Sequence, residues 1–174
     1  CGSGTTPIEA ALIAKNRAPG LDRSFAAQKW KNMDSKLWLE AGDEAMDKEF
    51  HGHYDIWGGD IDPAAVELAR HNAELAGVED CIRFEVADAG KFHRDSEYGQ
   101  LVTNPPYGER LLEKKEAEDL YRMFGAALRD LPPKWRVLVL SSHTEFERCF
   151  GRPADKKRKL YNGMIKCDVF MYGK

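Results

Sequence analysis

The alternation of short apolar strands with amphipathic helices constrains this 174-residue chain more than any other feature. The predicted strands are short apolar or β-branched runs bounded by turn residues, at 54–59, 81–86, 101–103, 137–140, 157–161 and 164–172. Strands separated by helices predict a Rossmann-like α/β fold, with a mostly parallel sheet and helices on both faces. Asn162-Gly163 joins the last two strands and is a strong hairpin signal, so one antiparallel strand should lie at or near the sheet edge.

The helices are predicted from capping residues and apolar periodicity. Thr5 or Thr6 can cap a first helix that ends at Ala18-Pro19-Gly20. Asp62 can cap a second helix that Pro63 opens, after the strand 54–59. Apolar periodicity predicts a long helix over 116–131 and a short one over 144–150. Residues 22–50 are expected to form a mainly helical insert.

Composition indicates one globular domain. The chain is 43% hydrophobic and 32% charged, and it has neither an apolar run of membrane-spanning length nor a leader segment, so we expect a cytoplasmic protein. Its four cysteines show neither a CxxC pair nor a metal-site spacing, which favours free thiols in a reducing compartment and no metal. A net charge of −3 leaves only a local basic face for nucleic acid.

Asn104-Pro105-Pro106-Tyr107 follows the predicted strand 101–103. Two consecutive prolines fix φ and remove two N–H groups, so the loop should be stiff and extended. Open α/β sheets bind ligands at the carboxyl ends of their strands, where this loop stands. Its amide oxygen and proline carbonyls could accept hydrogen bonds from an exocyclic amino group, and the Tyr107 ring could stack on a planar base.

Three further candidates mark other strand ends. The loop Cys1-Gly2-Ser3-Gly4-Thr5 leads into a helix and could bring backbone N–H groups to a ligand. Asp60 could bind ribose hydroxyls. Asp88 could accept from an adenine amino group while the Ala89 N–H donates to a ring nitrogen. Taken singly, the glycine loop and Asp88 are equally consistent with plain turn chemistry, but their order along the chain makes the set specific.

In these motifs the chain resembles class I S-adenosylmethionine-dependent methyltransferases. Within them it is similar to the THUMP-associated RNA methylase group, whose best-known activity is N2-methylation of guanine in 23S ribosomal RNA. The resemblance rests on CGSGT at 1–5, GDIDP at 59–63, Asp88-Ala89, NPPYGER at 104–110 and KRKLYNG at 157–163.

The resemblance implies roles for individual residues. The glycine loop, with Gly2, Ser3, Gly4 and Thr5, would approach the methionine part of the cofactor. Asp60 would hold the ribose, Ile61 would pack on the adenine, and Asp88 with Ala89 would bind the adenine edge. Asn104, Pro105, Pro106 and Tyr107 would hold the target base, with Asn104 also near the cofactor.

The family pattern also implies parts that this chain does not show. A strand normally precedes the glycine loop, and an RNA-binding THUMP-like domain is expected upstream. We therefore expect residues 1–174 to be the catalytic, C-terminal part of a longer protein whose first sheet strand is missing here.

Three functions remain open at this point. The first is methyl transfer to an exocyclic base amine in RNA, with guanine N2 of ribosomal RNA preferred because of GER after the NPPY motif and the closing hairpin. The second is an adenine-N6 DNA methyltransferase, since NPPY also fits that class. The third is a non-catalytic nucleotide-binding or RNA-binding module. Basic residues could contact phosphates or be plain solvated charge: Arg110, Lys114, Lys115, Arg152, Lys156, Lys157, Arg158 and Lys159.

Overall fold

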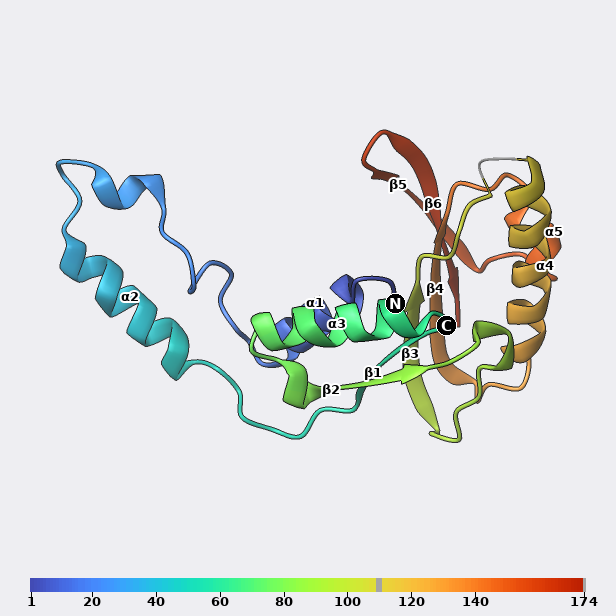
Figure 1. Ribbon diagram of the computed structural model, residues 1–174, viewed down its shortest axis with the longest axis horizontal. Helices are drawn as coiled ribbons and strands as arrows, with labels where there is room; N and C mark the ends of the chain where they lie inside the picture. The colour runs from blue at the N-terminus through green and yellow to red at the C-terminus, as the bar shows by residue number, and fades with distance from the viewer. Residues whose placement is uncertain (109–110, 174) are drawn as a thin grey trace.

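The computed structural model describes residues 1–108 and 111–173 and shows the α/β architecture of the sequence prediction (Figure 1). In chain order the elements are α1 (Thr5–Ala14), η1 (Ala26–Lys29), α2 (Ser35–Asp47), β1 (Ile56–Asp60), α3 (Pro63–Leu75), η2 (Glu79–Cys81), β2 (Ile82–Val86), η3 (Ala89–Lys91), β3 (Tyr98–Thr103), α4 (Leu111–Ala127), β4 (Lys134–Ser141), α5 (Phe146–Phe150), β5 (Lys156–Asn162) and β6 (Ile165–Tyr172).

The strands form two separate sheets. β1 and β2 pair in parallel, while the second sheet has the order β3-β4-β6-β5, in which β3 and β4 are parallel and β6 is antiparallel to both of its neighbours. The predicted hairpin is confirmed, with β5 at the edge of the sheet. Within the described ranges, no strand lies between β1 and β3, so each of these two strands has one unpaired edge.

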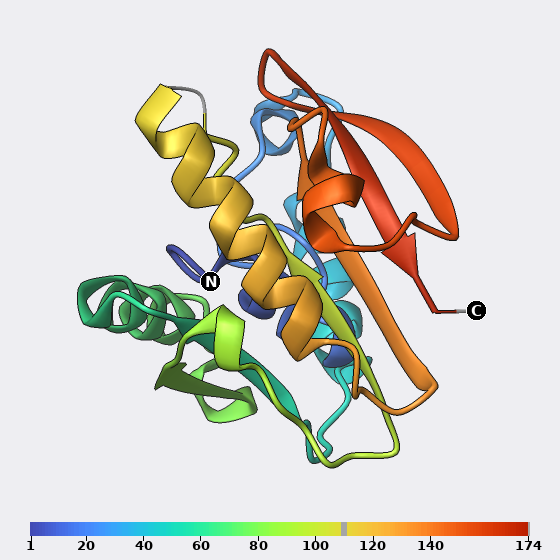
Figure 2. The same cartoon turned by 90° about the vertical axis from the view of Figure 1, so that its right-hand side faces the viewer.

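Two hydrophobic clusters stabilise the two sheets. In Figures 1 and 2, α4 and α5 cover one face of the four-stranded sheet. The cluster between them is rich in aromatic side chains, among them Tyr121, Phe124, Phe146, Phe150, Phe170 and Tyr172. The other cluster joins α1 and α3 to β1 and β2 through Ile8, Val66, Ala69, Ile82 and Phe84. The helices α1, α3 and α4 thus bury their apolar sides against strands, as the periodicity predicts.

An aromatic contact links the two sheets. The Phe92 ring lies edge-on to Trp57 of β1 at 6.0 Å between ring centroids and to Trp135 of β4 at 5.9 Å. Such edge-to-face pairs contribute beyond their buried area. Trp57 and Trp135 are therefore packing residues, whereas Trp30 lies on the surface with 65% of its area exposed.

Several predicted boundaries were wrong. The first helix begins at Thr5 with Gly4 as its N-cap, because Gly4 adopts a left-handed φ of 84° and no side chain caps the helix. This helix ends at Ala14, before Ala18-Pro19-Gly20, and α4 begins at Leu111 rather than near residue 116. Asp62 caps α3 as predicted, because its carboxylate accepts from the Ala64 N–H at 2.9 Å.

The segment between α1 and β1 forms an arm that extends away from both sheets (Figure 1). The arm carries η1 and α2, and no residue of α2 is buried. Its two ends meet, because the Phe50 N–H donates to the Lys15 carbonyl at 2.7 Å and Arg17 pairs with Glu49 at 3.0 Å. The main chain can therefore leave and re-enter the domain at one place.

The described part of the chain contains no helix that is both long and apolar enough to cross a membrane. In the same residues, no three side chains of His, Cys, Asp or Glu are grouped so that they could hold a metal ion. All four cysteines are free thiols.

Candidate active site

Asp60 ends β1 and binds the glycine loop directly. One carboxylate oxygen accepts from the Gly2 N–H and from the Cys1 amino group, each at 2.8 Å, and the other accepts from the Asp62 N–H at 3.1 Å. Burial raises the pKa of Asp60, but the hydrogen bonds from the Gly2 and Asp62 N–H groups and from the Cys1 nitrogen outweigh it and hold the pKa below its usual range. The group is therefore charged at neutral pH and keeps limited acceptor capacity for a ribose hydroxyl.

The glycine loop is open to a ligand at one glycine and closed at the other. Gly2 adopts φ 54°, and a Cβ added there would meet no atom within 4 Å. A Cβ on Gly4, where φ is 84°, would come within 2.9 Å of the Ala69 Cβ on α3. The loop is held from behind, since the Asn72 side chain of α3 donates to the Ser3 carbonyl at 2.9 Å. A ligand can thus approach the Gly2 backbone.

Replacing Gly4 by Ala is expected to lower the free energy of unfolding by about 2–4 kcal/mol, because the added methyl group combines left-handed strain with a clash against Ala69. The matched variant Gly2→Ala has the same kind of strain without the clash and should cost about 1–2 kcal/mol. Thermal unfolding without ligand measures both. Equal losses of Tm would contradict the packing role given to Gly4.

Asp88 and Ile61 lie at the carboxyl ends of β2 and β1. The Asp88 carboxylate accepts from the Gly90 N–H at 2.8 Å and so caps the short helix η3, which begins at Ala89. Asp88 therefore has the structural role in a turn that its sequence position allowed, and its Oδ1 already accepts a hydrogen bond within the chain. Ile61 has 69% of its area exposed, so its side chain is available to pack on a flat ring.

The loop from Asn104 to Tyr107 follows β3 and is anchored at both of its last two residues. The Pro106 carbonyl accepts from the hydroxyl of Tyr121, a fully buried residue of α4, at 2.6 Å. The Tyr107 hydroxyl accepts from the Asn162 side chain at 3.2 Å. Burial is the main cause of the raised pKa of Tyr107, so its phenol stays protonated at neutral pH. Asn104 itself is exposed.

The Pro106 carbonyl, one of the two expected acceptors for a ligand, already accepts from Tyr121. Within residues 1–108 and 111–173, no group donates to the Pro105 carbonyl. Glu109 and Arg110, which complete the NPPYGER motif, lie outside the described residues. The loop offers a fixed backbone with one engaged carbonyl, one carbonyl without a donor, and the Asn104 amide.

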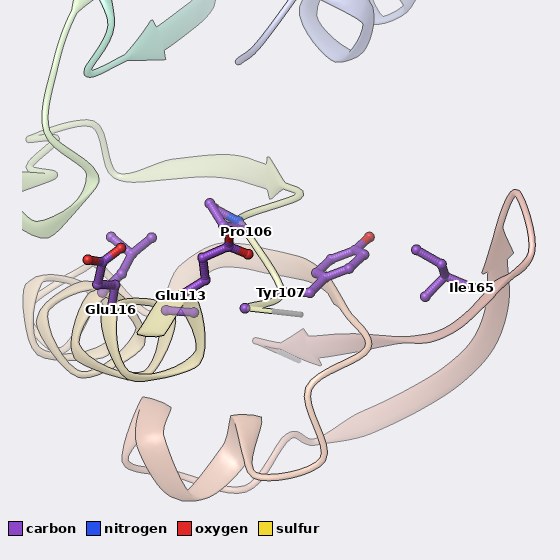
Figure 3. Close-up of a pocket in the computed structure, with 8 residues that line it drawn as sticks. Pro106, Tyr107, Glu113, Glu116 and Ile165 are labelled. Atoms are coloured by element: carbon purple, nitrogen blue, oxygen red, sulfur yellow. The ribbon is translucent and has the colours of Figure 1, made fainter. Parts of the chain in front are cut away.

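A cavity of about 500 Å³ adjoins this loop (Figure 3). Its lining residues come from the loop, from α4 and from β6: Pro106, Tyr107, Gly108, Glu113, Glu116, Ala117, Leu120 and Ile165. Figure 3 shows the Tyr107 ring pointing toward Ile165. None of the predicted cofactor residues lines this cavity.

The structure brings the sequence candidates together in two groups. The glycine loop and Asp60 form one hydrogen-bonded group, and Asn104 to Tyr107 form another at the end of β3. The turn that holds Asp88 packs on α4, where Gly90 faces Met123. Sequence reasoning missed Tyr121, Asn162 and Asn72 as supports of these loops, because their partners are distant in the chain.

Comparison with known proteins identifies the family. A profile of the RMKL-like methyltransferase domain matches residues 1–170. The chain is 45% identical over 99% of its length to "Putative RNA methyltransferase YpsC" of Bacillus subtilis, and 41% identical over 99% to the ribosomal RNA large subunit methyltransferase K/L of Shewanella baltica. It spans only 45% and 25% of the lengths of these two relatives.

Solved structures agree with this family. SMU.472, described as "a putative methyltransferase complexed with SAH", is 43% identical, and the match covers all of this chain and 46% of that one with a TM-score of 0.95. A protein of Listeria monocytogenes, described as "a predicted N6-adenine-specific DNA methylase", is also 43% identical, with a TM-score of 0.92, over all of this chain and 45% of that one.

S-adenosyl-L-methionine is the cofactor that follows from the family and from the S-adenosyl-L-homocysteine in SMU.472. The residues of this chain fit such a group, because the Gly2 backbone is open, the Asp60 carboxylate is charged and the Ile61 side chain is exposed. From its fold, its strand-end residues and these similarities, the chain belongs to the RMKL-like methyltransferase domain family.

Proposed function

We propose that this domain methylates an exocyclic amino group of a base in RNA, with guanine N2 of ribosomal RNA as the first candidate. The observation that carries the proposal is the anchored loop after β3, in which Tyr121 holds the Pro106 carbonyl and leaves Asn104 exposed. The relatives described as RNA and ribosomal RNA methyltransferases support RNA as the substrate class.

The proposed chemistry assigns separate tasks to the residues of the loop. S-adenosyl-L-methionine, when bound, supplies an electrophilic methyl group. An exocyclic amine is a weak nucleophile because its lone pair is delocalised into the ring. The Asn104 Oδ1 and the Pro105 carbonyl would accept its two N–H groups, direct the lone pair toward the methyl group and stabilise the positive charge that develops on nitrogen. As the N–C bond forms, the methyl–sulfur bond would break and release S-adenosyl-L-homocysteine, and the charged nitrogen would then lose one proton to water.

The other residues of the proposed site orient the two reactants. Tyr107 would stack on the target base, which has to leave its helical stack to reach the loop. The glycine loop, with Gly2, Ser3, Gly4 and Thr5, would place its N–H groups near the methionine part of the cofactor. Asp60 and Ile61 would hold the ribose and the adenine, and Asp88 with Ala89 would bind the adenine edge.

Product analysis tests the proposed function. Ribosomal RNA and genomic DNA are incubated separately with the full chain and isotopically labelled S-adenosyl-L-methionine, then digested to nucleosides for mass spectrometry. Labelled N2-methylguanosine from RNA is the expected product. Labelled N6-methyladenine from DNA, with no modified guanosine in RNA, would establish the second candidate, which the NPPY motif and the description of the Listeria monocytogenes neighbour favour.

Replacing Asp60 by Ala is expected to weaken S-adenosyl-L-methionine binding by about 10–100-fold. The variant removes a charged acceptor and also releases the Gly2 and Asp62 N–H groups; hydrogen bonds to charged groups contribute roughly 1.5–3 kcal/mol each. Isothermal titration calorimetry measures the affinity. Asp62→Ala is the neighbouring control: it removes the cap of α3, so it should lower Tm and change cofactor affinity much less.

We also propose that residues 1–174 are the catalytic domain of a longer protein. The 45% and 25% coverage of two relatives supports this arrangement. An upstream THUMP-like RNA-binding domain would then be the partner of this domain within the same chain.

A further inference from the structure

The β5–β6 hairpin projects past the edge of the sheet where the proposed site lies. Ser141, the last residue of β4, is paired with Asp168 of β6, which is paired in turn with Lys159 of β5. β5 runs in the same direction as β4, because β6 is antiparallel to both. The three residues after Lys159, together with the turn, therefore extend beyond the carboxyl end of β4.

The tip of this hairpin touches the loop proposed to hold the target base. The Asn162 side chain donates to the Tyr107 hydroxyl at 3.2 Å, and Ile165 lines the same cavity as Tyr107 (Figure 3). Any nucleic-acid strand that presents a base to Tyr107 must therefore pass close to the hairpin tip.

The side chains at the tip are exposed although they are apolar or aromatic. Met164 has 97% of its area exposed and Tyr161 has 72%. Leu160 and Ile165 are less exposed, at 42% and 37%. Aromatic side chains of this kind stack on unpaired bases, and apolar ones can insert between neighbouring bases.

A run of four basic residues, Lys156 to Lys159, leads along β5 toward the tip, and every residue of β5 is exposed. Lys157 is neutralised, since its Nζ lies 2.7 Å from a Glu147 carboxylate oxygen. Within the described part of the chain, Lys156 and Arg158 form no salt bridge. Because side chains alternate along a strand, these two share the face of Asn162 and stand about 6.6 Å apart.

We propose that the β5–β6 hairpin holds unpaired RNA next to the target base. Lys156 and Arg158 bind phosphates of the RNA along one face of β5. Tyr161, whose side chain lies on the opposite face of β5, stacks on a base where the RNA passes round the tip, and Met164 in the turn inserts beside a base that flanks the target. The inference rests on the proposed function and adds the surface that receives the substrate. Charge complementarity identifies the partner: on a chain with a net charge of −3, the basic run Lys156 to Lys159 is a local positive surface beside the proposed site, and RNA phosphates are negative.

The phosphate contacts can be counted from the salt dependence of binding. Fluorescence anisotropy would follow the full chain binding to a fluorescein-labelled single-stranded RNA of about 12 nucleotides. The double variant Lys156→Ala/Arg158→Ala should reduce the slope of log K against log salt by about 1.4, which corresponds to two lost contacts. Lys29→Ala/Lys31→Ala removes two exposed lysines from the arm and should leave the slope unchanged. Equal slopes for the two double variants would overturn the assignment.

The stacking role has its own matched pair of variants. Tyr161→Ala should weaken binding of the same RNA about 10-fold, whereas Tyr161→Phe keeps the ring and should bind like the parent chain. Equal affinities of Tyr161→Ala and Tyr161→Phe for the single-stranded RNA would contradict binding of unpaired RNA by the tip. The same would follow if Tyr161→Ala weakened binding of a duplex of the same sequence as much as binding of the single strand.

Two controls separate this inference from the proposed function. Affinity for S-adenosyl-L-homocysteine should be unchanged in every hairpin variant, because the altered side chains are exposed and the hydrogen bonds that hold the glycine loop come from Asp60 and Asn72. RNA binding that depends on the hairpin, in a parent chain that transfers no methyl group to RNA, would support the hairpin and refute the proposed function. Methyl transfer to RNA that is unaffected by all hairpin variants would support the proposed function and refute the role of the hairpin.

Discussion

Replacing Asn104 by Ala is expected to lower kcat for methyl transfer by about 100- to 1,000-fold. The variant removes the side-chain oxygen proposed to accept from the amino group, and loss of one such preoriented transition-state contact typically has an effect of this size. Affinity for S-adenosyl-L-homocysteine should change less than about 10-fold, because the glycine loop and Asp60 are untouched. Steady-state kinetics with labelled cofactor measures kcat, and calorimetry measures the affinity.

Gln100→Ala is the matched control for this prediction. Gln100 also carries an exposed amide, and it lies on β3, four residues before Asn104. Its removal should leave kcat within about two-fold of the parent value, since surface substitutions have small effects. Retention of full activity by Asn104→Ala, or an equal loss in both variants, would remove Asn104 from the catalytic role.

The sequence was sufficient to predict what depends on local patterns. Periodicity and turn residues located the strands, the Asp62 cap and the Asn162-Gly163 hairpin, because each depends on neighbours within a few positions. The same patterns placed Asp60, Asp88 and Asn104 at strand ends. Their proposed roles toward cofactor and base remain predictions, since those roles concern groups outside the chain.

Contacts between distant segments could not be predicted in this way. Tyr121 lies 15 residues after Pro106, and Asn162 lies 55 residues after Tyr107. Their hydrogen bonds depend on how α4 and the hairpin pack over the loop, and a tyrosine in an apolar helix face reads simply as a core residue. The left-handed Gly4 likewise acts as the cap of α1 because its backbone fits against Ala69, which periodicity does not reveal.

Residues 1–174 by themselves are expected to bind S-adenosyl-L-methionine at least about 10-fold more weakly than a longer chain that supplies one more parallel strand between β1 and β3. Asp60 ends one sheet and Asn104 follows the other, and both strands have an unpaired edge within the described residues. Because the two halves of the site are held by separate sheets, the cofactor must order them relative to each other when it binds. The smaller the fraction of molecules already in the binding geometry, the weaker the apparent affinity.

Hydrogen exchange distinguishes this cause from general instability. In residues 1–174, the alternate amides of β1 and β3 that point to the gap, meaning the unpaired edges of these two strands, should exchange fast with solvent. The amides of β4 and β6, which pair with a strand on both sides, should stay protected. The longer chain should protect the gap amides and raise cofactor affinity together, because one added strand would pair with both edges. Equal affinity in the two chains, or gap amides already protected in residues 1–174, would contradict the divided sheet as the cause.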